Sequence, residues 1–452
     1  MRPLSVMAHF VFVTAGISSY VHRLSALTRG LLARGHRVSV LSLRESGLRG
    51  WPADVCVARL ELPAHFVRRP GGLTGRRSLI AKERARANRI IAGEEFVNAL
   101  AALSPDLVVV DYELHAQIIQ AVSRGYPVML IEYECSPLQT GRVPMPSSPH
   151  VPGPGGCTAW RSRASWLGGL LLRRARITAS RLYYGGADWW STIRAVAARE
   201  GFDLSGRASR RHWQYLAYPE IPTLYLGPAA LDFPNTDPNP GFRVGPVAGM
   251  DRAENLDDPA YQQVLGMLER RNSAAVVYCA MGSILSNPGY FRRVIAAVAA
   301  RPEWSLILAA GRRMDPAALG SIPDNVHVLG HAPQLDVLRR ADAMLTHAGP
   351  ASIYEAVLSG VPLICYSGGA KEEHGNAARV AYHGLGLQGD LRKSSASRIE
   401  ADIAEVLGHP RYRSSVLRMR ERFLRQQESA RGLELLEQAA EESPASLPWR
   451  RF

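Results

Sequence analysis

The N-terminal part of the chain alternates short apolar runs with longer amphipathic stretches. Met7–Thr14 (MAHFVFVT) is almost wholly apolar, which is typical of a strand buried in a parallel sheet. Apolar residues then recur at helical spacing over Val21–Leu31, and Ser18 or Ser19 is expected to cap this helix. Val38–Leu43 is the next predicted strand. This succession of strand, helix and strand predicts a parallel sheet with helices on its faces.

The same pattern returns further along the chain. Asp106–Asp111 (DLVVVD) and Pro127–Ile131 (PVMLI) are predicted strands, and His115–Ser123 between them is a predicted helix. Pro137–Gly156 is rich in proline and glycine and predicts a loop, whose length is typical of a functional or mobile segment. Gly227–Asn255 is rich in proline and asparagine, which predicts a linker between two domains.

A second series of apolar runs follows the linker. Helical stretches separate these runs, so the second half repeats the α/β pattern of the first. Open parallel sheets bind ligands at the carboxyl ends of their strands, and two such halves predict a crevice between the domains. The predicted strands of the second half are Ala274–Cys279, Trp304–Ala309, Val326–Leu329, Ala343–Thr346 and Pro362–Tyr366.

Length, charge and cysteine content narrow the class of protein. A chain of 452 residues is too long for one compact core, so two or three domains are expected. The net charge is +14. Nearly all of the basic residues are arginine rather than lysine, which is typical of a GC-rich genome, and no DNA- or RNA-binding motif accompanies the positive charge. We therefore expect no nucleic-acid partner. We expect a cytoplasmic protein for three reasons. The five cysteines are scattered, no apolar run approaches about 20 residues, and the N-terminus does not resemble a signal peptide.

Two segments, Arg68–Arg89 and Trp160–Arg181, concentrate arginine. The favoured interpretation is an ordinary amphipathic helix, whose arginines face solvent and whose apolar residues face the core. The alternative is a basic amphipathic surface that contacts an anionic membrane or a lipophilic acceptor, because apolar residues lie among the arginines of the second segment. The sequence leaves a peripheral membrane contact open and does not indicate the oligomeric state.

The strongest candidate for ligand chemistry follows the strand Ala343–Thr346. His347 begins a sharp turn, and Pro350 suits the first position of the helix that follows. The free N–H groups and the dipole of such a helix start favour a phosphate. Ser352 adds a hydroxyl and His347 a donor, while Glu355, one turn further on, is placed to accept two ribose hydroxyls.

A similar arrangement follows the strand Ala274–Cys279. Gly282 permits close approach of the backbone, and Ser283 can donate to a phosphate. The Walker pattern GxxxxGK[ST] is absent, and no GxGxxG follows the first strand. The sequence therefore disfavours ATP hydrolysis and Rossmann-type dehydrogenase chemistry.

These motifs resemble the nucleotide-sugar-dependent glycosyltransferases of family 1, the bacterial relatives of UDP-glycosyltransferases that modify natural products. VVYCAMGS resembles the family's strand followed by Gly-Ser/Thr, and HAPQ its W-x-P-Q. THAGPASIYEAVLSGVP resembles H-x-G-x-N-S-x-x-E-A-x-x-x-G-V-P, and LARGHRV and LDFPNTDPNPGFRVGP match as well. The resemblance covers nearly the whole chain. It implies the α/β GT-B fold, with two Rossmann-like domains whose parallel sheets face an interdomain cleft.

The resemblance also implies how the chain is divided. Residues 1–235 would form an acceptor-binding domain, followed by a linker at 236–255. Residues 256–410 would bind the nucleotide sugar. Residues 411–452 would supply a C-terminal helix and tail that cross back to the N-terminal domain.

The family's donor-binding positions carry over residue by residue. His331 stands where the family stacks an aromatic ring on the base, Gln334 where it contacts base and ribose, and Glu355 where it binds ribose. Ala351 replaces the usual asparagine and removes one polar contact. The remaining implied donor residues bind the diphosphate (Gly282, Ser283, His347, Gly349 and Ser352) and the sugar hydroxyls (Glu372 and Glu373).

The catalytic base departs from the family pattern. The position of the family's histidine, fourteen residues before the arginine of R-G-H, is Tyr20 here. A tyrosine with an ordinary pKa of about 10 is a weak base at pH 7. His22 has suitable chemistry, although it faces away from Tyr20 if both are helical. Asp111, Glu113 and His115, which follow the strand DLVVVD, are further candidates. Glu132 and Glu134, which follow the strand PVMLI, are additional ones.

The sequence thus predicts an inverting glycosyltransferase that uses a UDP- or dTDP-sugar and a hydroxyl of a small lipophilic acceptor. No metal or other cofactor is expected, because the nucleotide sugar is a co-substrate. Two alternatives stay open. One is a non-catalytic nucleotide-sugar-binding relative that assists a partner enzyme, which Tyr20 favours. The other is a GT-B epimerase that converts the donor alone.

Overall fold

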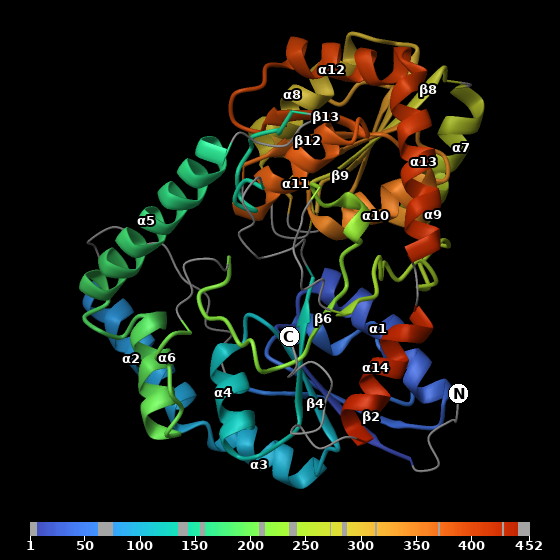
Figure 1. Ribbon diagram of the computed structural model, residues 1–452. Helices are drawn as coiled ribbons and strands as arrows, with labels where there is room; N and C mark the ends of the chain where they lie inside the picture. Colours follow the sequence, from blue (N-terminus) through green and yellow to red (C-terminus); the bar gives the residue numbers. More distant parts are fainter. Residues whose placement is uncertain are drawn as a thin grey trace.

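The computed structural model contains two α/β domains (Figure 1). Ser283 and two parts of the predicted loop Pro137–Gly156, residues 137–142 and 154–156, lie outside the residues that it describes. The described residues are 7–61, 76–133, 143–153, 159–207, 213–234, 242–271, 273–282, 287–311, 314–368, 371–426 and 429–441.

The N-terminal domain is built on a seven-stranded sheet in the order β3-β2-β1-β4-β5-β6-β7, with all neighbours parallel. Its central strands are buried on both faces, which explains their continuous apolar runs. The strands are β1 (His9–Thr14), β2 (Arg37–Ser42), β3 (Cys56–Arg59), β4 (Leu107–Asp111), β5 (Val128–Glu132), β6 (Thr223–Tyr225) and β7 (Phe242–Arg243).

The described residues of the N-terminal half form α1 to α6 around this sheet. The start of the first differs from expectation, because Ser18 is already helical and the capping position is Ile17, with no side-chain cap. The helices are α1 (Ser18–Ala33), α2 (Arg76–Ala92), α3 (Glu94–Leu103), α4 (His115–Ser123), α5 (Ala159–Tyr183) and α6 (Trp189–Arg199).

The C-terminal domain is built on a six-stranded parallel sheet in the order β10-β9-β8-β11-β12-β13. The five predicted strands of this half are confirmed, within one residue at each end. Its strands are β8 (Ala275–Ala280), β9 (Trp304–Ala309), β10 (Val326–Leu329), β11 (Ala343–Thr346), β12 (Leu363–Ser367) and β13 (Gly386–Asp390). Its helices are α7 (Pro259–Arg271), α8 (Pro288–Ala299), α9 (Gln334–Leu338), α10 (Pro350–Ser359), α11 (Lys371–Tyr382), α12 (Ala396–Gly408) and α13 (Pro410–Gln426).

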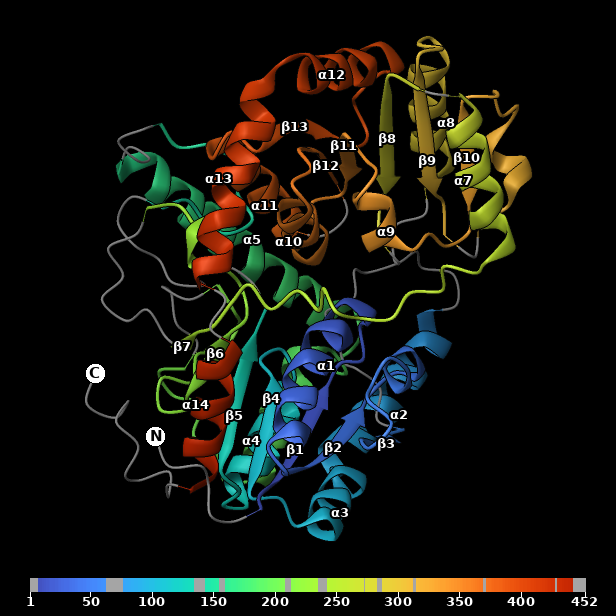
Figure 2. The ribbon, with the colours of Figure 1, turned by 90° about the vertical axis from the view of Figure 1, so that its right-hand side faces the viewer.

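The two sheets present their carboxyl ends to each other. The strands of the lower domain point upwards in Figure 2, while β8 and β9 of the upper domain point downwards. Loops that follow strands in both domains therefore meet at the domain boundary. Residues 143–153 of the N-terminal half also reach the upper domain, where Val143 packs with Phe233 and Ala378 of α11.

The end of the chain connects the domains a second time. α13 packs against α10 in the C-terminal domain, whereas α14 (Ser429–Glu441) packs against α1 in the N-terminal domain (Figure 1). Leu433 and Leu436 join the core cluster of α1, and Glu437 pairs with Arg34 at 2.6 Å and with His36 at 3.0 Å. Apolar burial and ion pairs together therefore hold α14 on the lower domain.

The long helix α5 lies along one side of the molecule and carries much of the second arginine-rich segment (Figure 1). It exposes Trp160, Leu167, Leu171 and Leu182. Peripheral contact of this face with a membrane stays a prediction. Among the described residues, no helix is both long and apolar enough to span a membrane.

Candidate active site

The turn between β11 and α10 ends in an uncapped helix start. Pro350 occupies the first turn of α10, where its missing N–H costs nothing. The capping residue is Gly349, which has no side chain to accept from the first N–H groups. The partial positive charge of this helix start is therefore available to an anion.

The imidazole of His347 is enclosed by two glycines beside this helix start. A Cβ at Gly282 would lie 2.7 Å from Cε1 of His347, and one at Gly349 would lie 2.5 Å from its Nε2. Gly282 also has a φ of +72°, which favours glycine. The close approach places His347 at the carboxyl ends of both β8 and β11.

His347 has an unused polar atom. Its Nδ1 is closed to water and makes no hydrogen bond within the described part of the chain. Burial lowers the pKa of His347, and the charge of Glu373 only partly offsets this, so the ring is neutral at pH 7. A neutral imidazole with an unpaired nitrogen is a suitable hydrogen-bond donor for a phosphate oxygen.

The other predicted diphosphate residues fall on both sides of His347. Ser352 lies in the first turn of α10 and is almost fully buried. Gly282 directly follows the end of β8, but Ser283 lies outside the described residues. Asn376 of α11 donates from Nδ2 to the carbonyl oxygen of Ala348 at 3.2 Å, which ties the turn to α11.

Glu355, the predicted ribose contact, is buried one turn along α10 and holds an arginine. Arg252 of the linker donates to both carboxylate oxygens, at 2.8 Å and 2.9 Å. Gln334 adds a third hydrogen bond at 2.7 Å and accepts one from Tyr278. A ribose must therefore share this carboxylate with Arg252 or displace it. Sequence reasoning missed Arg252, since no motif surrounds it.

At the predicted nucleoside end of the site, a residue of the N-terminal domain lies near His331. His331 is exposed just before α9, and its charge interacts with His22 of α1. Burial, Arg252 and His331 lower the pKa of His22 to about 4, although Glu254 opposes this. His22 is thus neutral at pH 7 and lies beside the linker, at the nucleoside end.

The predicted sugar-binding pair lies at the start of α11. Glu373 is buried, accepts a hydrogen bond from the Gly368 N–H at 3.2 Å and interacts electrostatically with His347. Glu372 interacts electrostatically with Glu113 of the other domain. The pair therefore adjoins both the candidate diphosphate site and the domain boundary.

Tyr20, at the expected base position, is part of an aromatic stack. Its ring lies flat on Tyr133, with centroids 3.8 Å apart and planes 11° apart. The Tyr133 hydroxyl donates to Asp111, which also accepts from the Thr14 hydroxyl and the Ala15 N–H, each at 2.8 Å. Burial raises the pKa of Asp111 to about 6, although these hydrogen bonds lower it. This arrangement secures the turn that follows β1.

His115 lies apart from the other candidates. It begins α4, is buried, and its Nδ1 is 3.0 Å from the Tyr218 hydroxyl. The rings of Tyr112 and Trp189 also contact it. The structure therefore places His115 in the aromatic packing between α4 and α6 and does not bring it to the donor residues.

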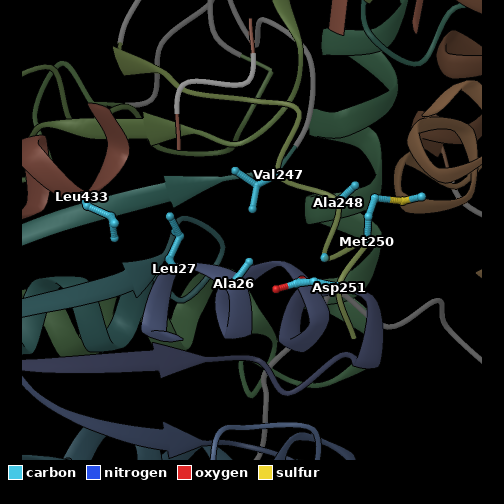
Figure 3. Close-up of a pocket in the computed structure, with 8 residues that line it drawn as sticks. Ala26, Leu27, Val247, Ala248, Met250, Asp251 and Leu433 are labelled. Atoms are coloured by element: carbon cyan, nitrogen blue, oxygen red, sulfur yellow. The ribbon is translucent and has the colours of Figure 1, made fainter. Parts of the chain in front are cut away.

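A hollow of about 220 Å³ lies beside the linker, below the usual 300–1,000 Å³ of a ligand pocket. Figure 3 shows Leu27 of α1, Leu433 of α14 and Val247 of the linker around it. Its described lining contains no predicted donor or base residue. It is a packing gap at the joint between the domains rather than a candidate active site.

Comparison with known proteins gives three findings. Residues 293–434 match the family model described as "Erythromycin biosynthesis protein CIII-like, C-terminal domain". Oleandomycin glycosyltransferase of Streptomyces antibioticus is 35% identical over 161 residues, which are 35% of this chain and 34% of that protein. The aligned region thus spans about a third of this relative.

Solved structures match over almost the full length. The kitacinnamycin glycosyltransferase structure gives a TM-score of 0.65 at 19% identity, covering 96% of this chain and 99% of that one. Spinosyn rhamnosyltransferase SpnG, complexed with thymidine diphosphate, gives 0.61 at 17% identity, covering 95% and 100%. At these identities the likeness shows the fold of both domains.

Proposed function

Because this chain has the GT-B fold and its residues 293–434 match the EryCIII-like C-terminal family model, we propose a glycosyltransferase activity. The protein moves a sugar from a UDP- or dTDP-sugar to a hydroxyl of a small lipophilic acceptor. The start of α10 with the unpaired Nδ1 of His347 carries this proposal. A helix start and a buried imidazole in the turn directly before it suit the diphosphate of such a donor substrate.

The named similar proteins support the substrate classes. One similar protein is named an oleandomycin glycosyltransferase, and the SpnG structure contains thymidine diphosphate. The proposal therefore favours a natural product as acceptor and includes dTDP-sugars as donors. The described cysteines Cys56, Cys279 and Cys365 are free thiols, in keeping with the proposed cytoplasmic location.

The proposed reaction is a single displacement. The acceptor oxygen bonds to the anomeric carbon on the face opposite the diphosphate, and the bond to the phosphate oxygen breaks. The electron pair leaves with the nucleoside diphosphate, and the anomeric configuration inverts. The α10 dipole, His347 and Ser352 stabilise the charge of the leaving group, so no metal ion is proposed. Glu372 and Glu373 orient the sugar through its hydroxyls.

Serines at opposite ends of α10 provide a matched test. Ser352 lies in its first turn and Ser359 is its last residue. With UDP-glucose, dTDP-glucose and a macrolactone alcohol as probes, we expect Ser352→Ala to slow transfer about 10-fold or more, because a hydrogen bond to a charged group contributes about 1.5–3 kcal/mol. Ser359→Ala should leave transfer unchanged. Equal rates for both variants would contradict the assignment of the diphosphate site.

One observation favours a second candidate, a non-catalytic nucleotide-sugar-binding protein. Tyr20 stands at the position of the family's catalytic histidine and is stacked on Tyr133. This candidate predicts nucleoside diphosphate binding by calorimetry with no turnover of any donor. An epimerase would instead convert the donor without an acceptor. Formation of a glycosylated acceptor would exclude both.

A further inference from the structure

The proposed transfer leaves one chemical role without a residue. An acceptor hydroxyl must lose its proton as its oxygen attacks, and four of the bases predicted from the sequence are engaged in other contacts. Tyr20 is stacked on Tyr133, and His22 lies at the nucleoside end. Asp111 already accepts three hydrogen bonds, and His115 is buried in aromatic packing.

Glu113 lies in the turn between β4 and α4, at the edge of the lower sheet that faces the upper domain. Its Oε1 is closed to water and has no hydrogen-bond partner among the residues that the structure describes. The charges that act on it come from both domains. Asp111, Glu132 and Arg44 belong to the lower domain, and Glu372 belongs to α11 of the upper domain.

The position of Glu113 has no evident benefit for folding. An enclosed carboxyl oxygen without a hydrogen-bond partner is unfavourable, and nearby carboxylates add repulsion. An apolar side chain in this turn would avoid both penalties. A partly buried carboxyl whose charge interacts with that of Glu372, a residue predicted to hold the sugar, is instead typical of a functional group.

We propose that Glu113 is the catalytic base of the transfer, a role that rests on the proposed function. Its carboxylate accepts the proton of the acceptor hydroxyl as the bond from oxygen to the anomeric carbon forms. The bond between that carbon and the phosphate oxygen breaks, and the nucleoside diphosphate leaves with the electron pair. The acceptor lies between Glu113 of the lower domain and the sugar held at Glu372 of the upper domain.

The surroundings adjust the strength of this base. Burial is the main reason why the pKa of Glu113 lies well above its usual value. The charges of Asp111, Glu132 and Glu372 raise this pKa further, while the charge of Arg44 lowers it. A base works best when its pKa lies near the working pH. Since only the ionised carboxylate accepts a proton, transfer should rise with pH through an inflection above the ordinary carboxyl range.

The test compares Glu113→Gln with Glu220→Gln in the full-length protein. Glu220 is an exposed glutamate of the same domain and serves as the control. With an aliphatic alcohol as acceptor, we expect E113Q to slow transfer about 10²- to 10⁴-fold and to abolish the pH inflection. Its affinity for dTDP and UDP should stay within twofold of wild type, and its melting temperature should not fall, because the substitution removes a buried charge.

A more acidic acceptor separates proton removal from a structural effect. 4-Nitrophenol ionises without help, so E113Q should transfer to it at a rate much closer to that of wild type. Transfer to the aliphatic alcohol within threefold of wild type, or an equal loss with both acceptors, would overturn the role of Glu113. If wild type itself transfers no sugar, the proposed function fails and this inference fails with it.

Discussion

The contact of Arg252 with Glu355, the proposed ribose-binding residue, yields a quantitative prediction. Arg252 makes two hydrogen bonds to Glu355, and the side chains are only 14% and 3% exposed. Arg252→Ala leaves the buried carboxylate with Gln334 as its remaining described partner. Removing one partner of a buried pair costs about 3–5 kcal/mol. Because Arg252 keeps some exposure, we expect Arg252→Ala to lower the free energy of unfolding by about 3 kcal/mol, the lower of these values.

The assay is urea unfolding of wild type, Arg252→Ala, Glu355→Gln and the double variant. Neutralising Glu355 removes the unpaired charge, so the double variant should be less destabilised than the sum of the two single changes, by at least about 1 kcal/mol. The pair of Arg29 and Asp251 is the control, since its side chains are 35% and 64% exposed. Arg29→Ala should cost no more than about 1 kcal/mol. Additive effects at Arg252 and Glu355 would refute the argument that the carboxylate depends on Arg252.

Three further predictions concern protons and metal ions. The pKa of Asp111 in the folded protein, about 6, lies above its usual 3.8, so the contribution of Asp111 to the free energy of unfolding falls as pH rises between these values. Asp111→Asn should therefore reduce the change in the free energy of urea unfolding across this pH range by about 3 kcal/mol. An unchanged pH dependence would contradict this. Burial lowers the pKa of His347, and a bound diphosphate would raise it, so dTDP should bind with uptake of a proton. Calorimetry in buffers of different ionisation enthalpy measures this uptake. Proton uptake that persists in His347→Asn would show that another group takes up the proton. Transfer should continue after exhaustive treatment with EDTA, whereas a loss that Mg²⁺ or Mn²⁺ restores would add a metal to the mechanism.

The buried strands could be predicted because a strand covered on both faces must be apolar. β9, β10 and β11 begin and end at the predicted residues. The edge strand β13 (Gly386–Asp390, GLQGD) escaped prediction, since it lacks an apolar run. The cap of α1 was predicted wrongly at Ser18 or Ser19, because the helix begins one residue earlier than a serine cap allows.

The turn between β11 and α10, which we propose binds the diphosphate, could be predicted from the sequence because the signals for a helix start are local. Proline in the first turn and the glycine before it mark the start of α10 within a few residues. Arg252 and Glu355 are 103 residues apart, and only folding brings them together. The approach of Glu113 to Glu372 across the domain boundary depends equally on tertiary structure. Sequence reasoning could therefore propose donor residues from local motifs, whereas the contacts that join distant parts of the chain came only from the structure.

The most direct test of the account is the affinity of the protein for a free nucleoside diphosphate. Titration calorimetry with dTDP and UDP would compare wild type with His347→Ala, and with His409→Ala as a control on the exposed end of α12. The account predicts that His347→Ala weakens binding about 10- to 100-fold, as the loss of a hydrogen bond to a charged group requires, while His409→Ala binds like wild type. Equal affinities for all three proteins would show that the diphosphate does not bind at the start of α10.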